Sequence, residues 1–130
     1  MSKQCLSIEQ MQHLKELGVD TSKANVYWHN VVKFEKKKTV NEWILSLSSS
    51  VPLMIKTIPT FTLQDILDLL PATVDDDYRL YIDKGLVLWT VGYVDAVSEE
   101  IYEVFRERDL IDAAYEMLCW VIENGYLKVK

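Results

Sequence analysis

The sequence predicts an α+β fold, in which a largely antiparallel sheet of four to five strands packs with three helices in a single domain over residues 1–130. Three stretches of the chain begin and end with helix-capping signals, and segments of alternating aromatic and β-branched residues lie between them. With 130 residues, of which 49% are hydrophobic, the chain is the size of one ordinary domain. No internal repeat or low-complexity linker divides it.

The first predicted helix covers residues 8–17. Ser7 can cap its free amides, and Gln10 at the third helical position completes a capping box. Gly18 supplies the left-handed residue that ends a helix. The boundaries of this helix therefore rest on signals at both ends.

The second predicted helix, residues 63–70, uses the same device. Thr62 is its cap, and the Asp65 side chain can bond back to the Thr62 amide to complete a capping box. Pro71 prevents the helix from continuing. The third helix is about 15 residues long. It starts after Asp109 and stops at Gly125, where Tyr126 is placed to reach back to the last turn.

A first hairpin is predicted from "NVYWHNVVKF" and "TVNEWILSL", joined by a turn that holds Lys36, Lys37 and Lys38. A solvated turn is favoured over a nucleic-acid contact for these three lysines. Period-two alternation places apolar side chains on one face of both strands. These side chains are Val26, Trp28, Val32 and Phe34 in the first strand, and Trp43, Leu45 and Leu47 in the second.

A second hairpin is predicted from "YRLYI" and "LVLWTVGYV", which flank a turn in which Gly85 can take a positive φ. Both faces of the later strand, from Leu86 onward, are apolar, so that strand is expected to be central or covered on both sides. Residues 96–107 fit either a third strand or a helix capped by Ser98. The strand is favoured because Ile101 and Tyr102 suit it.

The net charge of −6 is unevenly distributed along the chain. Residues 1–60 carry 8 Lys and 5 Asp+Glu, a net +3, whereas residues 61–130 carry 6 Lys+Arg and 15 Asp+Glu, a net −9. An acidic half disfavours nucleic acid as a partner, because phosphate binding needs clustered Lys and Arg. A basic partner suits this surface better, although the acidic residues can equally serve only to keep the domain in solution.

The sequence also predicts a cytoplasmic protein that does not enter the membrane. No charged and apolar leader opens the chain, and no apolar run approaches the roughly 20 residues that span a bilayer. Cys5 and Cys119 share no metal-site spacing and are too few for a disulfide framework, so reduced thiols are expected.

No catalytic, cofactor-binding or metal-binding residues can be assigned from the sequence, which favours a protein that is not an enzyme. It contains no glycine-rich phosphate loop, no G-x-S-x-G elbow and no H-E-x-x-H motif. His13 and His29 belong to different elements, and His29 is expected on the polar face of its strand. Asp75, Asp76 and Asp77 lack the glycine and terminal glutamate of a calcium loop, so a solvated loop is expected.

The third helix carries the candidate binding surface. At about 100° per residue, its carboxylates fall within one narrow arc with Cys119 at the border, and nearly every other position is apolar. Such a helix is expected to pack on the sheet and to be touched by another element or subunit. Cys119 is assigned a packing role, because neighbouring carboxylates and the helix C-terminus oppose thiolate formation. The candidate partner-binding residues are Asp112, Glu116, Met117, Trp120 and Glu123.

Three segments, "CLSIEQMQHLKELGVDTSKA", "TLQDILDLLP" and "LIDAAYEMLCWVIENGYL", resemble a family of small uncharacterised proteins from Bacteroides-type gut bacteria and their prophages. These segments are caps, staples and a core helix. The resemblance implies a bacterial cytoplasm and a phage or mobile-element context. It supplies no functional residues, because the family has no assigned activity.

The function that the sequence favours is a non-catalytic binding module of prophage or mobile-element origin, acting on a host or phage protein. One alternative is a small carboxylate-based hydrolase or nuclease that needs an added divalent ion. A cluster of acids with perturbed pKa values in one pocket would favour this alternative. A phage structural or assembly protein is the other alternative, and a homo-oligomer is compatible with the sequence.

Overall fold

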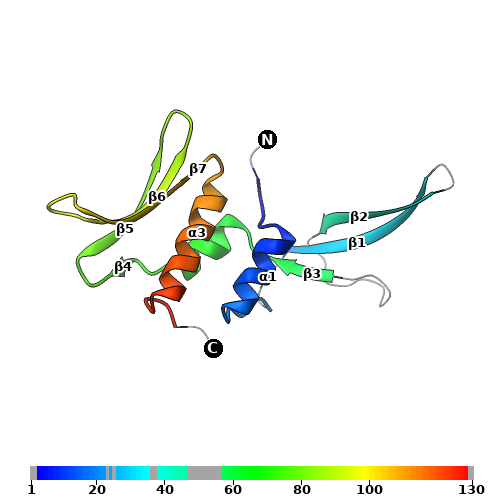
Figure 1. The fold of residues 1–130 in the computed structure, drawn as a ribbon, viewed down its shortest axis with the longest axis horizontal. Coiled ribbons are helices and arrows are strands. Elements are labelled where there is room, and N and C mark those ends of the chain that lie inside the picture. The colour runs from blue at the N-terminus through cyan, green and yellow to red at the C-terminus, as the bar shows by residue number, and fades with distance from the viewer. Residues whose placement is uncertain (1–2, 23, 25, 36–37, 47–56, 129–130) are drawn as a thin grey trace.

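Two antiparallel sheets lie on either side of a group of three helices in the computed structural model (Figure 1). The structure describes residues 3–22, 24, 26–35, 38–46 and 57–128. The first sheet has the strand order β2-β1-β3 and the second β4-β5-β6-β7. The elements are α1 (Ile8–Glu16), β1 (Val26–Glu35), β2 (Lys38–Ser46), β3 (Thr57–Thr60), α2 (Leu63–Leu69), β4 (Thr73–Val74), β5 (Tyr78–Lys84), β6 (Trp89–Asp95), β7 (Ile101–Glu107) and α3 (Leu110–Glu123).

The predicted α+β class is confirmed, with three helices and antiparallel strand pairing throughout. The strands are, however, divided between a sheet of three and a sheet of four, where the sequence predicted one sheet of four to five. The β1–β2 hairpin extends away from the helices, whereas the four-stranded sheet packs against α3 (Figure 1). None of the helices in the described residues is long and apolar enough to cross a membrane.

Both predicted capping boxes are present. The Ser7 hydroxyl accepts a hydrogen bond from the Gln10 amide at 3.2 Å, and the Gln10 side chain accepts one from the Ser7 amide at 2.9 Å. Thr62 and Asp65 make the equivalent pair of bonds at the start of α2. The cap side chains thereby satisfy amides that the first helical turn leaves free.

The two ends of α3 behave differently. Gly125 has φ +78, and the Tyr126 amide donates to the Val121 carbonyl at 2.8 Å, so the predicted glycine-terminated end is confirmed. At the other end, Asp109 occupies the cap position but makes no side-chain capping bond. Its carboxylate instead accepts a hydrogen bond from the Lys3 amide at 3.2 Å, which ties the N-terminal segment to α3.

The β1–β2 hairpin has the predicted pairing. Trp28 lies opposite Leu45, so these two apolar residues share a face. Lys38 is the first residue of β2, opposite Glu35, and is not in the turn. The other predicted turn lysines, Lys36 and Lys37, lie outside the described residues, as do Leu47 and the side chains of Val32 and Phe34.

Strand β3 was not predicted. It pairs antiparallel with β1, on the edge opposite β2. Thr60 is fully buried, and its hydroxyl donates to the Leu6 carbonyl at 2.7 Å. The Trp28 indole donates to the same carbonyl at 3.0 Å, so the residue that precedes the cap of α1 also anchors the first sheet.

In the second sheet, β6 lies between β5 and β7, which confirms that it is central. Leu86, Val87 and Leu88 do not belong to it, because they form the turn before it and are 105%, 70% and 39% exposed. Gly85 does not take the predicted positive φ. It is needed for space, since a Cβ there would lie 2.9 Å from the Leu88 carbonyl oxygen.

The ambiguous stretch 96–107 is resolved in favour of the strand, which is β7. Residues before it form a turn in which the Asp95 carboxylate accepts hydrogen bonds from the Val97 and Ser98 amides, at 2.8 and 3.0 Å. These bonds lower the pKa of Asp95. A local turn therefore replaces the helix start that Ser98 could have provided.

The hydrophobic core surrounds α3, which touches α2 on one side and β6 and β7 on another. This double contact explains why the helix is apolar around most of its circumference. Its fully or nearly fully buried members are Ile111, Ala113, Ala114, Met117, Leu118 and Val121. The helix is therefore covered by its own chain along both of its apolar faces.

Candidate functional site

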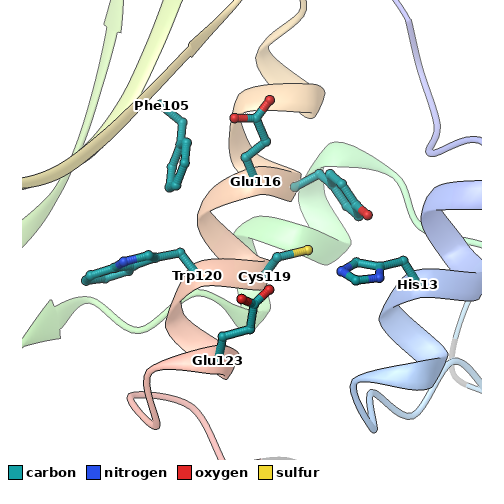
Figure 2. Close-up of a pocket in the computed structure, with 7 residues that line it drawn as sticks. His13, Phe105, Glu116, Cys119, Trp120 and Glu123 are labelled. Atoms are coloured by element: carbon teal, nitrogen blue, oxygen red, sulfur yellow. The ribbon is translucent and has the colours of Figure 1, made fainter.

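Residues of α3, β7 and α1 line a groove with a volume of about 310 Å³. In Figure 2, Phe105 and Trp120 stand on one side of the helix, His13 lies on the other, and the Cys119 side chain lies between them. Glu116 and Glu123 lie toward the two ends. We call this feature the α3 groove; its lining residues are His13, Phe105, Tyr115, Glu116, Cys119, Trp120 and Glu123.

The spacing of the helical residues explains why they meet in one groove. Positions 116, 119, 120 and 123 are separated by three, four and seven residues, which places them on one side of an α-helix. Three of the five candidate partner-binding residues, Glu116, Trp120 and Glu123, line the groove. Two of the three carboxylates in the predicted arc thus lie on a concave surface.

The other two candidates lie elsewhere. Met117 is fully buried in the core, so it offers no surface to a partner. Asp112 is held within the chain, because its Oδ1 accepts from the Lys3 ammonium at 2.8 Å and from the Gln10 side-chain Nε2 at 3.0 Å. This carboxylate joins α3 to α1 and to the N-terminal segment.

Trp120 forms part of an aromatic cluster at the edge of the groove. Its ring stacks on Tyr126 with the centroids 5.3 Å apart and meets Tyr102 edge-on at 5.6 Å. The hydroxyls of Tyr102 and Tyr126 are hydrogen-bonded to each other, and Tyr126 also donates to Asp75 at 3.2 Å. Packing of this kind holds the indole in place, so the Trp120 wall of the groove is rigid.

Glu116 is the electrostatically unusual group of the groove. Burial, a hydrogen bond with Glu107 on β7, and the negative charges of Glu107 and Asp112 raise its pKa to about 7. The proton that Glu116 retains lets it donate to Glu107. The groove therefore ends in a carboxyl–carboxylate pair that changes its charge near neutral pH.

This pair predicts a pH-dependent stability. The folded-state pKa of Glu116 lies above its unfolded value, so its contribution is complete below about pH 4.5 and is lost as the pH rises through about 7. In Glu116→Gln, the side-chain amide can donate a hydrogen bond to Glu107 at any pH. At pH 8, we expect the free energy of unfolding of this variant to be about 1 kcal/mol higher than that of the wild type, a value that allows for solvent screening. At pH 5, the two free energies of unfolding should differ little.

Urea denaturation of both proteins at the two pH values measures this difference. Glu123→Gln, on the exposed end of the same helix, is the matched control. The difference in free energy of unfolding between this variant and the wild type should be the same at both pH values. If the difference in free energy of unfolding between Glu116→Gln and the wild type is the same at pH 5 and pH 8, the carboxyl pair does not form as described.

Cys119 faces His13 across the groove (Figure 2), a proximity that the sequence did not show. The pKa of the thiol is nevertheless raised to about 11, first by burial and further by Glu123 and Glu116, against a lowering hydrogen bond from Tyr115. The carboxylates act in the direction that the sequence predicted, although burial is the larger cause. The His13 Nδ1 lies 4.0 Å from a carboxylate oxygen of Glu16, and both side chains are exposed.

We therefore expect Cys119 to react with iodoacetamide at pH 8 at least about tenfold more slowly in the folded protein than in urea, because the thiolate is the reactive form. Mass spectrometry of the quenched reaction, with Cys5 as an internal comparison, gives both rates. A folded-state rate above the unfolded one would show a thiol activated by His13.

Two further predictions on ionisable residues have different outcomes. His29 was expected on a polar face but is buried, with its Nδ1 3.1 Å from the Thr57 hydroxyl on the unpredicted strand β3. Asp75, Asp76 and Asp77 are all exposed, as expected for a solvated loop. In the part of the chain that the structure describes, no three His, Cys, Asp or Glu side chains converge to hold a metal ion.

Comparisons with known proteins found no matching family model, no matching curated protein and no matching solved structure. The groove must therefore be interpreted from its own chemistry. The contributions of His13, Phe105 and Glu107 were not visible in the sequence, because α1 and β7 meet α3 only through the tertiary fold.

Proposed function

We propose that this protein is a non-catalytic binding module that holds a positively charged segment of a partner protein in the α3 groove. The observation that carries the proposal is the lining of the groove. Glu123 and the carboxyl–carboxylate pair of Glu116 and Glu107 provide negative charge, aromatic rings provide apolar walls, and no lysine or arginine is among the described lining residues. Aromatic rings and carboxylates together attract cationic side chains.

The charge of the surrounding chain supports a basic partner. Residues 61–130, which include α3 and β7, carry a net −9. A surface of one sign raises the rate of encounter with partners of the opposite sign. The resemblance of three segments to prophage proteins supports a mobile-element origin, with a host or phage protein as the partner in the bacterial cytoplasm.

The test is a titration with two soluble peptides of equal length, one of lysine and glycine and one of glutamate and glycine, followed by NMR. We expect the lysine peptide alone to shift the signals of groove residues, and added salt to weaken its binding. Glu123→Gln should weaken binding about threefold, the size expected for one partly exposed ion pair.

Glu99→Gln is the control, because it removes the same charge from an exposed turn outside the groove. Equal weakening by Glu99→Gln and Glu123→Gln would show attraction by net charge only. That outcome, or an absence of shifts in the groove, would refute the proposed site.

A small hydrolase is the second candidate function, and one observation favours it. Glu116 and Glu107 form a hydrogen-bonded carboxyl pair at a groove, with the pKa of Glu116 raised to about 7. A carboxyl group with that pKa is suited to proton transfer at neutral pH. Turnover of ester, glycoside or phosphodiester substrates, with and without added Mg²⁺, that disappears in Glu116→Gln would establish this function in place of the first.

A further inference from the structure

An asparagine–glycine pair, Asn124–Gly125, directly follows the last residue of α3. In such a pair the glycine nitrogen can attack the asparagine Cγ, because no side chain crowds that nitrogen. The N–Cγ bond forms as the Cγ–Nδ2 bond breaks, and the glycine N–H proton leaves with the Nδ2 group as ammonia. Water then adds at one of the two carbonyl carbons of the cyclic imide and leaves aspartate or isoaspartate. Either product carries a carboxylate where the asparagine had a neutral amide.

The backbone conformation of the pair, and not packing, blocks this reaction. Both residues are exposed, and a Cβ added to Gly125 would meet nothing within 4 Å. Asn124, however, has ψ 8°, so the Gly125 nitrogen nearly eclipses the Asn124 nitrogen about the Cα–C bond. The imide ring is nearly flat, so its closure needs the Gly125 nitrogen to eclipse the Asn124 Cβ instead, about a third of a turn away. The attack therefore requires Asn124 to leave its helix-end conformation.

Hydrogen bonds hold both reacting groups in the blocked conformation. The Gly125 amide, which supplies the attacking nitrogen, donates to the Ile122 carbonyl at 3.1 Å. The Asn124 Nδ2, which is the leaving group, donates to the Trp120 carbonyl at 2.9 Å. Tyr126 closes the turn by stacking on Trp120, with the ring centroids 5.3 Å apart. Helix ends are among the parts of a fold that open most readily, and opening this one breaks these contacts together.

We propose that Asn124 is a conformationally gated deamidation site, which the closed end of α3 protects and which reacts when the last turn of the helix opens. The product disfavours closing again. It lacks the Nδ2 donor to Trp120 and places negative charge at the helix C-terminus, where the helix dipole opposes it. Isoaspartate also adds one atom to the backbone before Gly125. Because Trp120 is a wall of the α3 groove (Figure 2), the modification loosens that wall, whatever the groove binds.

The gate is tested by incubating the full chain at pH 8 in buffer and in urea, and by following deamidation at Asn124 with mass spectrometry of the digested chain. We expect the reaction to be at least about tenfold slower in the folded protein, because only the opened fraction reacts. Tyr126→Ala should raise the folded-state rate at least about threefold and leave the rate in urea unchanged. Tyr81→Ala, which truncates an exposed tyrosine on β5, is the matched control and should change neither rate.

Equal rates in buffer and in urea would overturn the inference, because the folded helix end would then give no protection. Equal folded-state rates for Tyr126→Ala and Tyr81→Ala would also overturn it, since the turn would not be the gate.

The effect of the product is measured by hydrogen exchange at the Tyr126 amide, which donates to the Val121 carbonyl at 2.8 Å in the closed turn. We expect exchange at least about threefold faster in the deamidated chain, refolded from urea, than in the unmodified chain. Asn124→Asp carries the aspartate product without a urea step and should change exchange in the same direction. Unchanged exchange in both samples would overturn the proposed loosening of the helix end.

Discussion

Replacing Tyr93 with alanine is expected to lower the free energy of unfolding by about 3–5 kcal/mol, the range for truncation of a buried aromatic side chain. Tyr93 lies on the central strand β6, is fully buried, and has a ring centroid 6.4 Å from that of Trp120. Its hydroxyl donates to the Pro71 carbonyl at 2.7 Å, which ties the sheet to the end of α2. One side chain therefore connects the sheet, α3 and the segment after α2.

Urea denaturation at constant pH measures this loss, and two variants separate its parts. Tyr93→Phe keeps the ring but removes the donor to Pro71, which should cost about 1–2 kcal/mol. Tyr81→Ala, on the neighbouring strand β5 where the side chain is 42% exposed, should cost less than about 1 kcal/mol. Similar losses for Tyr93→Ala and Tyr81→Ala would contradict the described core.

The elements that were predictable from sequence are those whose determinants are local. The bonds between Ser7 and Gln10, and between Thr62 and Asp65, join residues three positions apart. The turn at Gly125 likewise depends on one positive φ and on the preceding helical turn. Capping chemistry of this kind acts before any tertiary contact forms, so its pattern is readable along the chain.

The division into two sheets depends on distant pairings and was not predictable. Strand β3 contains Pro59, which lowers the strand signal of a short segment, and it pairs with residues about 30 positions earlier in β1. The buried bond from Thr60 to Leu6 spans 54 positions. Such contacts fix which strands share a sheet, and no local pattern reports them.

The apolar run at Leu86–Leu88 shows how a local pattern misleads. Its composition is typical of a strand, yet the register pairs Lys84 with Trp89 and leaves these residues in the turn. The Gly85 amide closes that turn by donating to the Leu88 carbonyl at 2.9 Å. Strand pairing on both sides therefore decides where β6 begins, against the hydrophobic pattern.

The candidate site was predictable only in part, because its helical residues follow a local pattern and its other residues do not. Helical periodicity correctly grouped Glu116 and Glu123 with Trp120 on accessible parts of α3, but it also assigned Met117 to that surface. Periodicity gives the angle of a side chain about the helix axis and does not identify what covers it. Met117 is fully buried in the core, and the pKa of Glu116 is raised first by burial and then by Glu107 on β7.

Replacing Glu116 with lysine is expected to abolish binding of basic peptides while leaving the protein folded. The new ammonium would face Glu107 and Asp112, the two carboxylates whose charges act on Glu116. Attraction to these carboxylates offsets the cost of burying the ammonium, so the variant should keep its fold. For a cationic ligand the same change replaces attraction by repulsion, so affinity should fall at least about tenfold.

The separation of these two effects makes the variant informative. Loss of binding through unfolding would be accompanied by a lower urea midpoint, whereas loss of binding through charge leaves the midpoint unchanged or higher. Calorimetric titration with the lysine–glycine peptide, and urea denaturation of the same sample, give both quantities. If Glu116→Lys binds that peptide as tightly as the wild type does, the α3 groove cannot be the site at which positive charge is recognised.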